Sequence, residues 1–319
     1  MMPPQMPVFI AFLLGLVLLL ALLASWELWQ IVSANPPRRP EIVRVVGNAT
    51  SSQPIPKIIW TYWHAAPEPE LVQRCLANWQ RFNPDHELRL LHADNAQDWL
   101  TPEQDFAARA HLPAYRQADW LRLQLLALHG GIWMDASTLL TDSLAWVHAL
   151  QAEHQANFVG FFVDRYTQAP ERPMVENWFL AAPPGSRFIA DLAAEFERAL
   201  TLGEPAYLAE LRSSGELAAA AQGLPESMQE YLVMHVAASH VLARGTQGYR
   251  MALRRAEDSA FAYLAALRWR KRHLFARLAL TRCPARVPNL IKLRGGDRQV
   301  IERNLHRVRP RSLLARYLP

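Results

Sequence analysis

Two acidic side chains and one basic side chain near the middle of the chain have the types and spacing to act on a polar ligand. Asp119 and Arg122 lie three residues apart in a strongly apolar stretch, so a helix would place both on one side. Asp135 follows the apolar residues 132–134, and Ser137 stands two positions after it. Charged groups in an apolar helix are costly unless each is paired or faces a cleft. The pattern therefore predicts either a buried ion pair or a polar binding site.

A core helix and a short strand are the elements that would position these side chains. Residues 118–128 leave almost no polar face, which indicates a buried helix that begins near Pro113. Gly130 and Gly131 suit the C-cap of that helix, and residues 132–134 then form a short apolar strand. Because ligands bind outside the carboxyl ends of strands in open α/β sheets, the carboxylate after this strand is expected at such an edge.

The pattern D-x-x-R followed by GG-I-W-M-D-A-S resembles the sugar-nucleotide site of DXD-type glycosyltransferases. It is most similar to the capsular polysaccharide synthesis family, relatives of mannosyltransferases and glucosylating toxins. The resemblance runs from about Ile55 to about Arg294 and is strongest in residues 55–63 and 113–140. It implies an α/β, GT-A-like (Rossmann-like) nucleotide-sugar-binding domain. It also implies a nucleoside-diphosphate sugar donor, with a UDP-sugar favoured, a divalent Mn²⁺ or Mg²⁺ ion, and retention of the anomeric configuration.

The resemblance assigns the catalytic roles to the central motif. Asp135 would contact the metal and the ribose or sugar, Asp119 would bind donor sugar hydroxyls, and Arg122 would orient the donor. Ser137 departs from the pattern, because a second carboxylate is expected there as a metal ligand. Asp135 and the diphosphate could hold the metal with Ser137 or water completing the shell, which we favour. Alternatively Asp142 could substitute, or the metal site could be weak or lost.

Donor and acceptor roles outside this core also follow from the resemblance. Trp60 would stack on the nucleobase, where an aromatic face contributes about 1–3 kcal/mol, although it also fits a core position. The other predicted nucleotide- or donor-binding residues are Tyr62, Gly131, Ser137 and Lys292. Glu176 and Asn177 would lie on the acceptor or donor side, or would be exposed polar residues at a strand end.

Charge is distributed unevenly along the 319 residues, whose formal net charge is +5. Residues 250–319 hold 18 Lys/Arg and 4 Asp/Glu, whereas the remainder holds 16 and 25. A basic tail on an acidic body indicates contact with a polyanion such as a membrane surface. Within the tail, residues 267–280 alternate basic and apolar side chains, which predicts an interfacial amphipathic segment or, alternatively, a solvated basic helix. Two cysteines do not make a disulfide framework.

The N-terminus predicts a membrane anchor. Residues 1–26 contain no charged side chain, and residues 8–24 are continuously apolar, long enough to span a bilayer. A cleaved signal peptide is the alternative, but the stretch before the apolar run lacks the usual basic residues. Arg38, Arg39 and Arg44 follow the span, so the positive-inside rule places the rest of the chain in the cytoplasm, at a bacterial inner membrane.

These observations predict four segments: an anchor (1–33), a linker (34–54), a catalytic domain (55–248), and a basic extension (249–319) that completes the domain. The predicted function is a hexosyltransferase-type enzyme acting on a surface or capsular polysaccharide or a lipid-linked glycan. The alternative is a non-catalytic, membrane-tethered binding or assembly protein that kept the fold, which the serine at position 137 favours. No motif for nucleic-acid binding is recognisable, so no nucleic-acid partner is expected.

Overall fold

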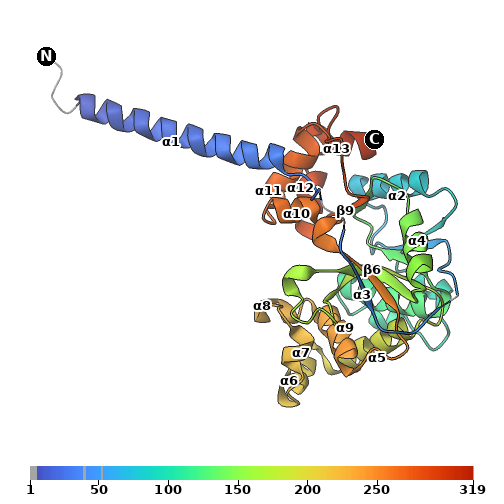
Figure 1. Ribbon diagram of the computed structural model, residues 1–319. Coiled ribbons are helices and arrows are strands. Elements are labelled where there is room, and N and C mark those ends of the chain that lie inside the picture. The colour runs from blue at the N-terminus through green and yellow to red at the C-terminus, as the bar shows by residue number, and fades with distance from the viewer. Residues whose placement is uncertain (1–5, 39–40, 52, 319) are drawn as a thin grey trace.

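The computed structural model describes residues 6–38, 41–51 and 53–318 of the chain. Residues 1–5 of the predicted anchor, and residues 39–40 and 52 of the predicted linker, lie outside these ranges, so Arg39 is not described. A long N-terminal helix projects from a body of strands and helices (Figure 1). The predicted α/β class is confirmed as a mixed α/β fold with a central sheet.

A seven-stranded mixed sheet in the order β1-β8-β6-β7-β4-β2-β3 forms the centre of the body. Five of its strands share one direction, and β7 and β1 run opposite to them. A separate two-stranded antiparallel sheet joins β5 to β9. The strands are β1 (Val43–Val46), β2 (Ile58–Tyr62), β3 (Glu87–Leu91), β4 (Gly131–Met134), β5 (Thr138–Leu140), β6 (Phe158–Phe162), β7 (Val175–Ala182), β8 (Met251–Arg255) and β9 (Leu290–Lys292).

Helices cover both faces of the large sheet. The α-helices are α1 (Met6–Ser33), α2 (Glu70–Phe82), α3 (Ala114–His129), α4 (Ala145–His154), α5 (Arg187–Leu202), α6 (Glu204–Ser213), α7 (Leu217–Ala221), α8 (Glu226–Gln229), α9 (Val233–Arg244), α10 (Ala262–Ala266), α11 (Lys271–Phe275), α12 (Gly295–Glu302) and α13 (Leu313–Tyr317). One π-turn, η5 (Ala276–Leu280), continues α11. Short 3₁₀ turns are η1 (Ala96–Trp99), η2 (Ala107–Arg109), η3 (Asp164–Tyr166), η4 (Ala256–Asp258) and η6 (Leu305–Arg307).

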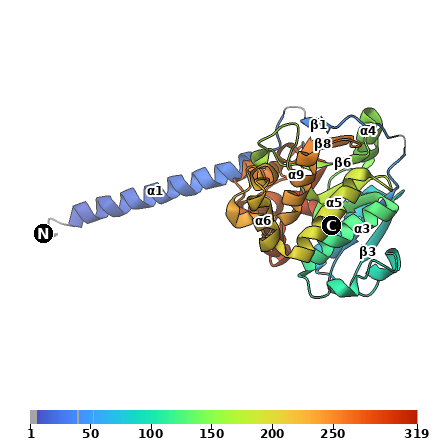
Figure 2. The ribbon, with the colours of Figure 1, turned by 90° about the horizontal axis from the view of Figure 1, so that it is seen from below.

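Side chains that alternate along each strand divide the apolar core into two layers. In β4, Trp133 belongs to one layer, whereas Ile132 and Met134 belong to the other. The first layer packs against α3, α5 and α9, and Figure 2 shows α3 and α5 lying side by side. The second packs against α2, α4 and the C-terminal helices. Strands buried on both faces are apolar throughout, which is why residues 132–134 show no alternation in sequence.

The glycine pair after α3 is required by backbone geometry. Gly130 caps the helix with φ of 63°, and its N–H donates to Leu126 O. Gly131 has φ of 101°, and a Cβ there would lie 2.8 Å from Ile58 O. Both conformations are strained for residues with a side chain. The pair therefore lets the chain turn from the buried helix straight into β4, as predicted for the C-cap.

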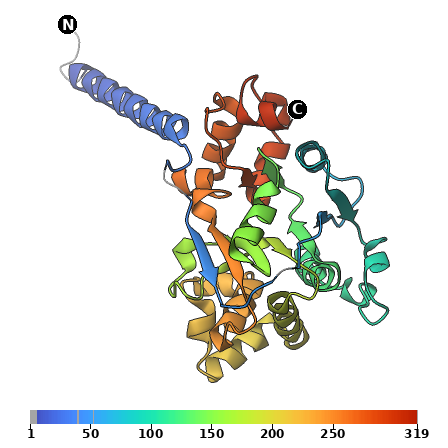
Figure 3. The same cartoon turned by 45° about the vertical axis from the view of Figure 1, so that its right-hand side comes forward.

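The C-terminal segment is tied into the body by strand pairing and by one buried amide. β9 pairs with β5, which places Lys292 opposite Thr138. Asn78 of α2 donates to Leu140 O at 2.9 Å and to Tyr317 O at 2.8 Å, so its side chain joins α2, β5 and α13. The basic extension is therefore packed against the sheet, and Figure 3 shows it beside the end of α1.

Three segments differ from the sequence expectations. Val43–Val46, inside the predicted linker, forms an edge strand of the large sheet. The sequence pattern of residues 226–243 predicts a helix, but in the structure this stretch divides into α8 and α9. The apolar side chains of the predicted amphipathic segment 267–280 face the protein core, since Leu274 and Leu278 are fully buried. That segment therefore has no free apolar face to insert into a membrane, because its apolar side chains are buried in the protein core.

α1 is long and apolar enough to cross a membrane over Phe9–Ser33, and none of that window is buried in the body. A signal sequence at an N-terminus has the same properties. Contacts with the body begin at its C-terminal end, where Glu27 pairs with Arg270 at 2.9 Å and with His273. The foot of α1 is thus fixed against α11 and η5, while the apolar part projects away (Figure 1).

Candidate functional site

Asp135 lies at the carboxyl end of β4, as the sequence predicted. Its N–H donates to Trp178 O on the neighbouring β7, and its carbonyl accepts from Thr138 N in a tight turn that leads into β5. This turn carries the chain from the large sheet to the small one. The Asp135 side chain, 30% exposed, therefore points into the space between the two sheets, where Lys292 Nζ meets its Oδ2 at 2.7 Å.

Six charged side chains of alternating sign form a continuous chain that ends at this lysine. We call it the charge chain: Glu204, Arg116, Asp119, Arg122, Asp135 and Lys292. Its successive N···O distances are 2.9, 3.1, 3.0, 3.4 and 2.7 Å. Each buried charge has an opposite charge on at least one side, which offsets the cost of burying it. The predicted triad of Asp119, Arg122 and Asp135 is thus brought together, with Lys292 beside it.

Asp119 and Asp135 of the charge chain differ in their tendency to hold a proton. Burial raises the pKa of Asp119, even though Arg122 and Arg116 act against it. Burial opposes the charge of Asp135 as well, but there Lys292 and Arg122 outweigh it, and the pKa of Asp135 lies below its ordinary value. Asp135 is therefore the more firmly ionised carboxylate of the pair.

Asn177 and Glu176, predicted on the acceptor or donor side, reach the same place from β7. Asn177 Nδ2 donates to Asp119 Oδ1 at 3.0 Å, and Arg122 donates to the Asn177 carbonyl. The Glu176 carboxylate lies 3.5 Å from His235 Nε2 on α9. Because β7 is antiparallel to β4, its amino end lies at the same sheet edge as Asp135. Glu176 is buried and Asn177 is half-buried, so neither is an exposed residue at a strand end.

A cleft of about 400 Å³ opens at this edge of the sheet. A smaller pocket of about 100 Å³, lined by Asp119, Arg122 and Asp135 among others, shares several of its residues. Such a volume suits a small organic ligand. The lining residues of the cleft are Asp135, Val163, Arg165, Tyr166, Glu176, Asn177, Trp178, Met228, Tyr231, Leu232, His235, Phe261, Trp269, Lys292, Arg294 and Gly295.

Positive charge and aromatic rings dominate the outer wall of the cleft. Arg165 and Arg294 both contact the ring of Trp269, with guanidinium carbons 4.9 and 5.3 Å from its centroid. Trp269 and the preceding Arg268 both have positive φ, 62° and 52°. Such strained backbone at non-glycine residues often marks functional sites. Together with Lys292 these arginines make a cationic wall opposite an aromatic surface, suited to a ligand with phosphates and a ring.

The residues around Asp135 do not fit a divalent metal ion. Within the described ranges, no three His, Cys, Asp or Glu side chains are grouped to hold one. Ser137 donates its hydroxyl to Leu293 O, and Lys292 already occupies the Asp135 carboxylate. Asp142 is exposed beyond the far end of β5. A site for Mg²⁺ or Mn²⁺ needs several free oxygen ligands, and here the Asp135 carboxylate is bound to an ammonium group and the Asp119 carboxylate to two arginines.

Three predicted donor-binding residues lie outside the cleft. Trp60 is 0% exposed, and its Nε1 donates to Gly130 O at 2.9 Å, at the amino end of β4 and thus away from Asp135. With no exposed ring face, Trp60 does not fit the predicted base-stacking role. Tyr62 is buried and donates to Gln117 Oε1 at 2.6 Å. Gly131 allows β4 to approach β2 closely, because it has no side chain. All three belong to the packing of the sheet, because aromatic strand residues suit a core equally well.

The cleft contains functional candidates that the sequence analysis missed. Arg165 and Tyr231 were not singled out, and Trp269 belonged to a segment predicted as either an interfacial amphipathic segment or a solvated basic helix. The apolar sequence of residues 157–164 predicts a buried strand, and Arg165 follows it. The rule that ligands lie at carboxyl ends of strands could therefore have indicated Arg165. Tyr231 lies between α8 and α9, where the sequence predicted an unbroken helix, and no local signal marks it.

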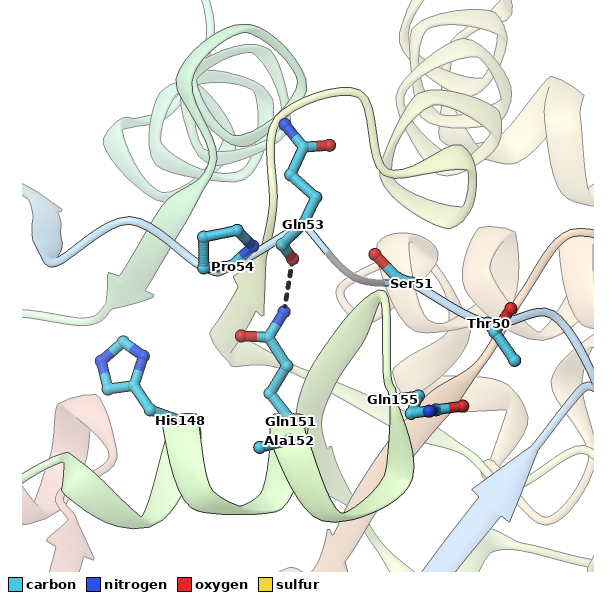
Figure 4. A pocket seen from close by; sticks show the side chains of 8 residues that line it. All are labelled: Thr50, Ser51, Gln53, Pro54, His148, Gln151, Ala152 and Gln155. Atoms are coloured by element: carbon cyan, nitrogen blue, oxygen red, sulfur yellow. Dashed lines mark hydrogen bonds between the residues drawn. The ribbon is translucent and has the colours of Figure 1, made fainter.

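Another cavity, of about 540 Å³, is lined by Thr50, Ser51, Gln53 and Pro54 on one side and by α4 and Gln155 on the other. Figure 4 shows its wall of amide and hydroxyl side chains, in which Gln151 Nε2 donates to Gln53 O at 2.9 Å. His148 is the titratable group among its lining residues. No carboxylate or arginine lines it, so it offers little for binding a charged ligand.

Comparison with known proteins supports the family resemblance. Residues 41–198 match the family described as capsular polysaccharide synthesis protein, which confirms the predicted resemblance to that family. The chain is 30% identical over 155 residues to O-glycosyltransferase braB of Annulohypoxylon truncatum, and 25% identical over 161 residues to O-glycosyltransferase PaGT of Phomopsis amygdali. These matches cover 42% and 46% of this chain but only 35% and 39% of the two relatives, so this chain spans little more than a third of their length.

Among solved structures, PaToxG Glycosyltransferase aligns with 92% of this chain and 94% of its own, at 13% identity and a TM-score of 0.38. That score is too low to establish a shared fold. The family match includes Asp119, Arg122, Asp135 and Asn177 but ends before Lys292. The carboxylates of the site therefore lie in the matched region, and the terminal cation of the charge chain lies outside it.

Proposed function

Because residues 41–198 match the capsular polysaccharide synthesis family, we propose that this protein is a glycosyltransferase that moves a sugar from a nucleoside-diphosphate sugar to a glycan. A UDP-sugar is the favoured donor, and a surface or capsular polysaccharide or a lipid-linked glycan is the proposed acceptor. The observation that carries the proposal is the meeting of the charge chain and a cationic, aromatic cleft at the carboxyl edge of the sheet. Both curated relatives are named O-glycosyltransferases.

The proposed donor fits the distribution of charge in the cleft. Lys292, Arg165 and Arg294 would face the diphosphate, whose leaving requires stabilisation of developing negative charge. Asp119 and Asn177 line the inner pocket, where carboxylate and amide oxygens accept hydrogen bonds from sugar hydroxyls. Tyr231 and Trp269 offer the aromatic surface for the base. The GT-A-like assignment is part of this proposal, supported by a ligand cleft at the carboxyl ends of parallel strands.

We assign no step to a metal ion, because the groups around Asp135 do not fit one. In the proposed reaction, Lys292 moves from Asp135 toward the leaving diphosphate and supplies the charge that a metal would otherwise bring. Asp135 then remains ionised beside the sugar and ribose, with Arg122 to hold it. Retention of the anomeric configuration is proposed from the family resemblance alone, and nuclear magnetic resonance of the first product formed would test it.

The test is nucleotide binding by the full-length protein in detergent. UDP and GDP are titrated by calorimetry, once with Mn²⁺ and once with EDTA. We expect one nucleotide to bind in both conditions with similar affinity, because the cations of the cleft are side chains of the protein and not added metal ions. Absence of binding by a folded protein would contradict the proposed donor class.

A non-catalytic binding protein is the second candidate. It is favoured because Ser137 replaces the expected carboxylate and donates its hydroxyl hydrogen bond to Leu293 O. The two candidates are distinguished by incubating the protein with the sugar derivative of whichever nucleotide binds more tightly. An enzyme produces free nucleoside diphosphate, slowly when the sugar is transferred to water and rapidly when it is transferred to an acceptor. A binding protein produces none.

A membrane location on the cytoplasmic side is also proposed. It is supported by the apolar, unburied α1 and by Arg38 and Arg44 after it. Extraction of the protein from membranes by detergent but not by high salt is the expected result.

A further inference from the structure

Arg277 is a buried cation whose hydrogen-bond partners are all neutral. It lies in η5 and is 2% exposed. Its guanidinium donates to Ala34 O at 2.7 Å, to Asn35 Oδ1 at 3.0 Å and to Thr281 Oγ1 at 2.7 Å. These bonds fix the residues that follow α1 to the C-terminal segment. They satisfy the N–H groups but leave the charge itself without a counterion.

Within the described ranges, no carboxylate lies at ion-pair distance from Arg277. Arg116 makes a useful contrast, because it is equally buried but has Asp119 at 3.1 Å and Glu204 at 2.9 Å. A buried charge without a partner is strongly unfavourable, and proteins normally pair it or neutralise it. An anion from outside the chain would supply the missing partner for Arg277.

Three more arginines surround a pocket beside Arg277. This arginine pocket, of about 730 Å³, is lined by Arg277, Arg282, Arg311 and Arg316, and none of its described lining residues is acidic. The last three are exposed, and among the described residues none of them has a carboxylate partner. Arg316 lies over the ring of Tyr317 with its guanidinium carbon 5.4 Å from the centroid. Four guanidinium groups in one hollow make a site for a phosphate group.

The arginine pocket lies at the depth where lipid headgroups would be. Val32 and Asn35, at the C-terminal end of α1, line it. Glu27, five residues before Val32, is the first charged residue of α1 and pairs with Arg270, so the apolar span ends before it. Five helical residues rise about 8 Å, and the headgroup layer on each side of a bilayer is roughly 5–8 Å thick.

We propose that the arginine pocket binds the phosphate of an anionic membrane lipid. The lipid's acyl chains would lie along the apolar surface of α1, and its phosphate would provide the counterion for Arg277. A free phosphate ion has the same charge chemistry but no apolar part to place beside α1. The basic tail therefore meets the membrane through one pocket of arginines, and not through the amphipathic segment 267–280, whose apolar face is buried.

The test is lipid binding to the full-length protein in a neutral detergent. Three probes are titrated by calorimetry: dihexanoyl phosphatidylglycerol, dihexanoyl phosphatidylcholine and inorganic phosphate. We expect the phosphatidylglycerol to bind and the zwitterionic lipid and inorganic phosphate to bind at least tenfold more weakly. Equal binding of both lipids would overturn the proposal in favour of simple partition into the detergent. Equal binding of inorganic phosphate would overturn it in favour of a free-anion site.

A triple variant with R282Q, R311Q and R316Q tests the residues. It leaves the buried Arg277 in place, and these exposed side chains are not needed for folding. Each cation near an anionic headgroup contributes about 1 kcal/mol, so the three changes should weaken phosphatidylglycerol binding about 100-fold. The matched control, R187Q with R212Q and R244Q, removes the same charge from exposed positions on α5, α6 and α9.

Binding by the control should stay within threefold of the unaltered protein. If the pocket variant binds the lipid as tightly as the control does, the arginine pocket is not the site. UDP binding serves as an independent check, because the cleft does not include these three arginines and its affinity for UDP should be unchanged in both variants.

Discussion

Replacing Lys292 with methionine removes the ammonium group that ends the charge chain while keeping most of the side-chain volume. Lys292 is buried in β9, and its Nζ lies 2.7 Å from Asp135 Oδ2. The substitution therefore has two consequences that can be measured separately. One is the loss of a cation for a bound diphosphate, and the other is the loss of a partner for Asp135.

The expected effect on nucleotide binding is the larger of the two. A hydrogen bond to a charged group contributes about 1.5–3 kcal/mol, which corresponds to roughly a 10- to 150-fold increase in Kd. Breaking a fully buried ion pair costs about 3–5 kcal/mol, but Asp135 keeps Arg122 at 3.4 Å and is 30% exposed to water. We therefore expect the free energy of unfolding to fall by only about 1–2 kcal/mol.

The assay is titration of UDP and GDP in EDTA, with thermal unfolding measured on the same samples. Lys57→Met is the matched control, because Lys57 is an exposed lysine paired with Asp85 outside the cleft. Lys292→Arg should restore part of the affinity, since it returns the charge with different geometry. A folded Lys292→Met variant whose Kd for nucleotide changes less than threefold would refute the role of Lys292 as a diphosphate-binding cation.

Three further predictions address the site and the fold. Asp135→Ala should abolish sugar transfer while leaving the far-ultraviolet circular dichroism spectrum unchanged, and retained activity would remove Asp135 from the mechanism. Asn78→Ala removes the side-chain partner of the buried Leu140 N–H and carbonyl, whereas Tyr317 O keeps Arg81, so urea unfolding should show a loss of about 2–4 kcal/mol. Burial acts against the charge of Glu195, but hydrogen bonds from His240 and Tyr207 hold the pKa of Glu195 at about 2, and the Glu195 bond raises the pKa of His240. The His240 contribution to stability is complete below pH ~6.5 and is lost as pH rises through its folded pKa, whereas that of Glu195 is lost as pH falls below ~4.3. Tm should therefore fall between pH 6 and pH 8, and a His240→Gln variant should show a flatter profile.

The sequence predicted the centre of the site well because its signals are local. D-x-x-R fixes two side chains on one helical face, and the glycine pair fixes the turn that brings β4 beneath them. The carboxyl-end rule then places Asp135 at the sheet edge. Each of these inferences depends on residues fewer than twenty positions apart, where helix and strand geometry decides the arrangement.

Inferences that depend on distant packing were less successful. The sequence left the places of Trp60 and Trp269 open. Trp60 fitted either a nucleobase or the core, and Trp269 belonged to a segment predicted as either an interfacial amphipathic segment or a solvated basic helix. In the structure Trp60 is enclosed by the sheet and α3, whereas Trp269 lines the cleft and contacts two arginines. The difference arises because β9 and the C-terminal helices fold back onto β5, a pairing across about 150 residues that no periodicity reveals.

That pairing also determines the electrostatics of the proposed reaction. The family-matched region alone contributes the carboxylates of Asp119, Asp135 and Glu176 to the two pockets but neither Lys292 nor Arg294. Arg122 and Arg165 are the cations that it contributes to their lining. The register of β9 against β5 places Lys292 beside Asp135, and Arg294 follows two residues later. Under the proposed function, we expect a donor with a negatively charged leaving group to bind only when the C-terminal segment is docked. The same segment would then serve two proposed sites, the donor cleft through Lys292 and Arg294 and the arginine pocket at the foot of α1.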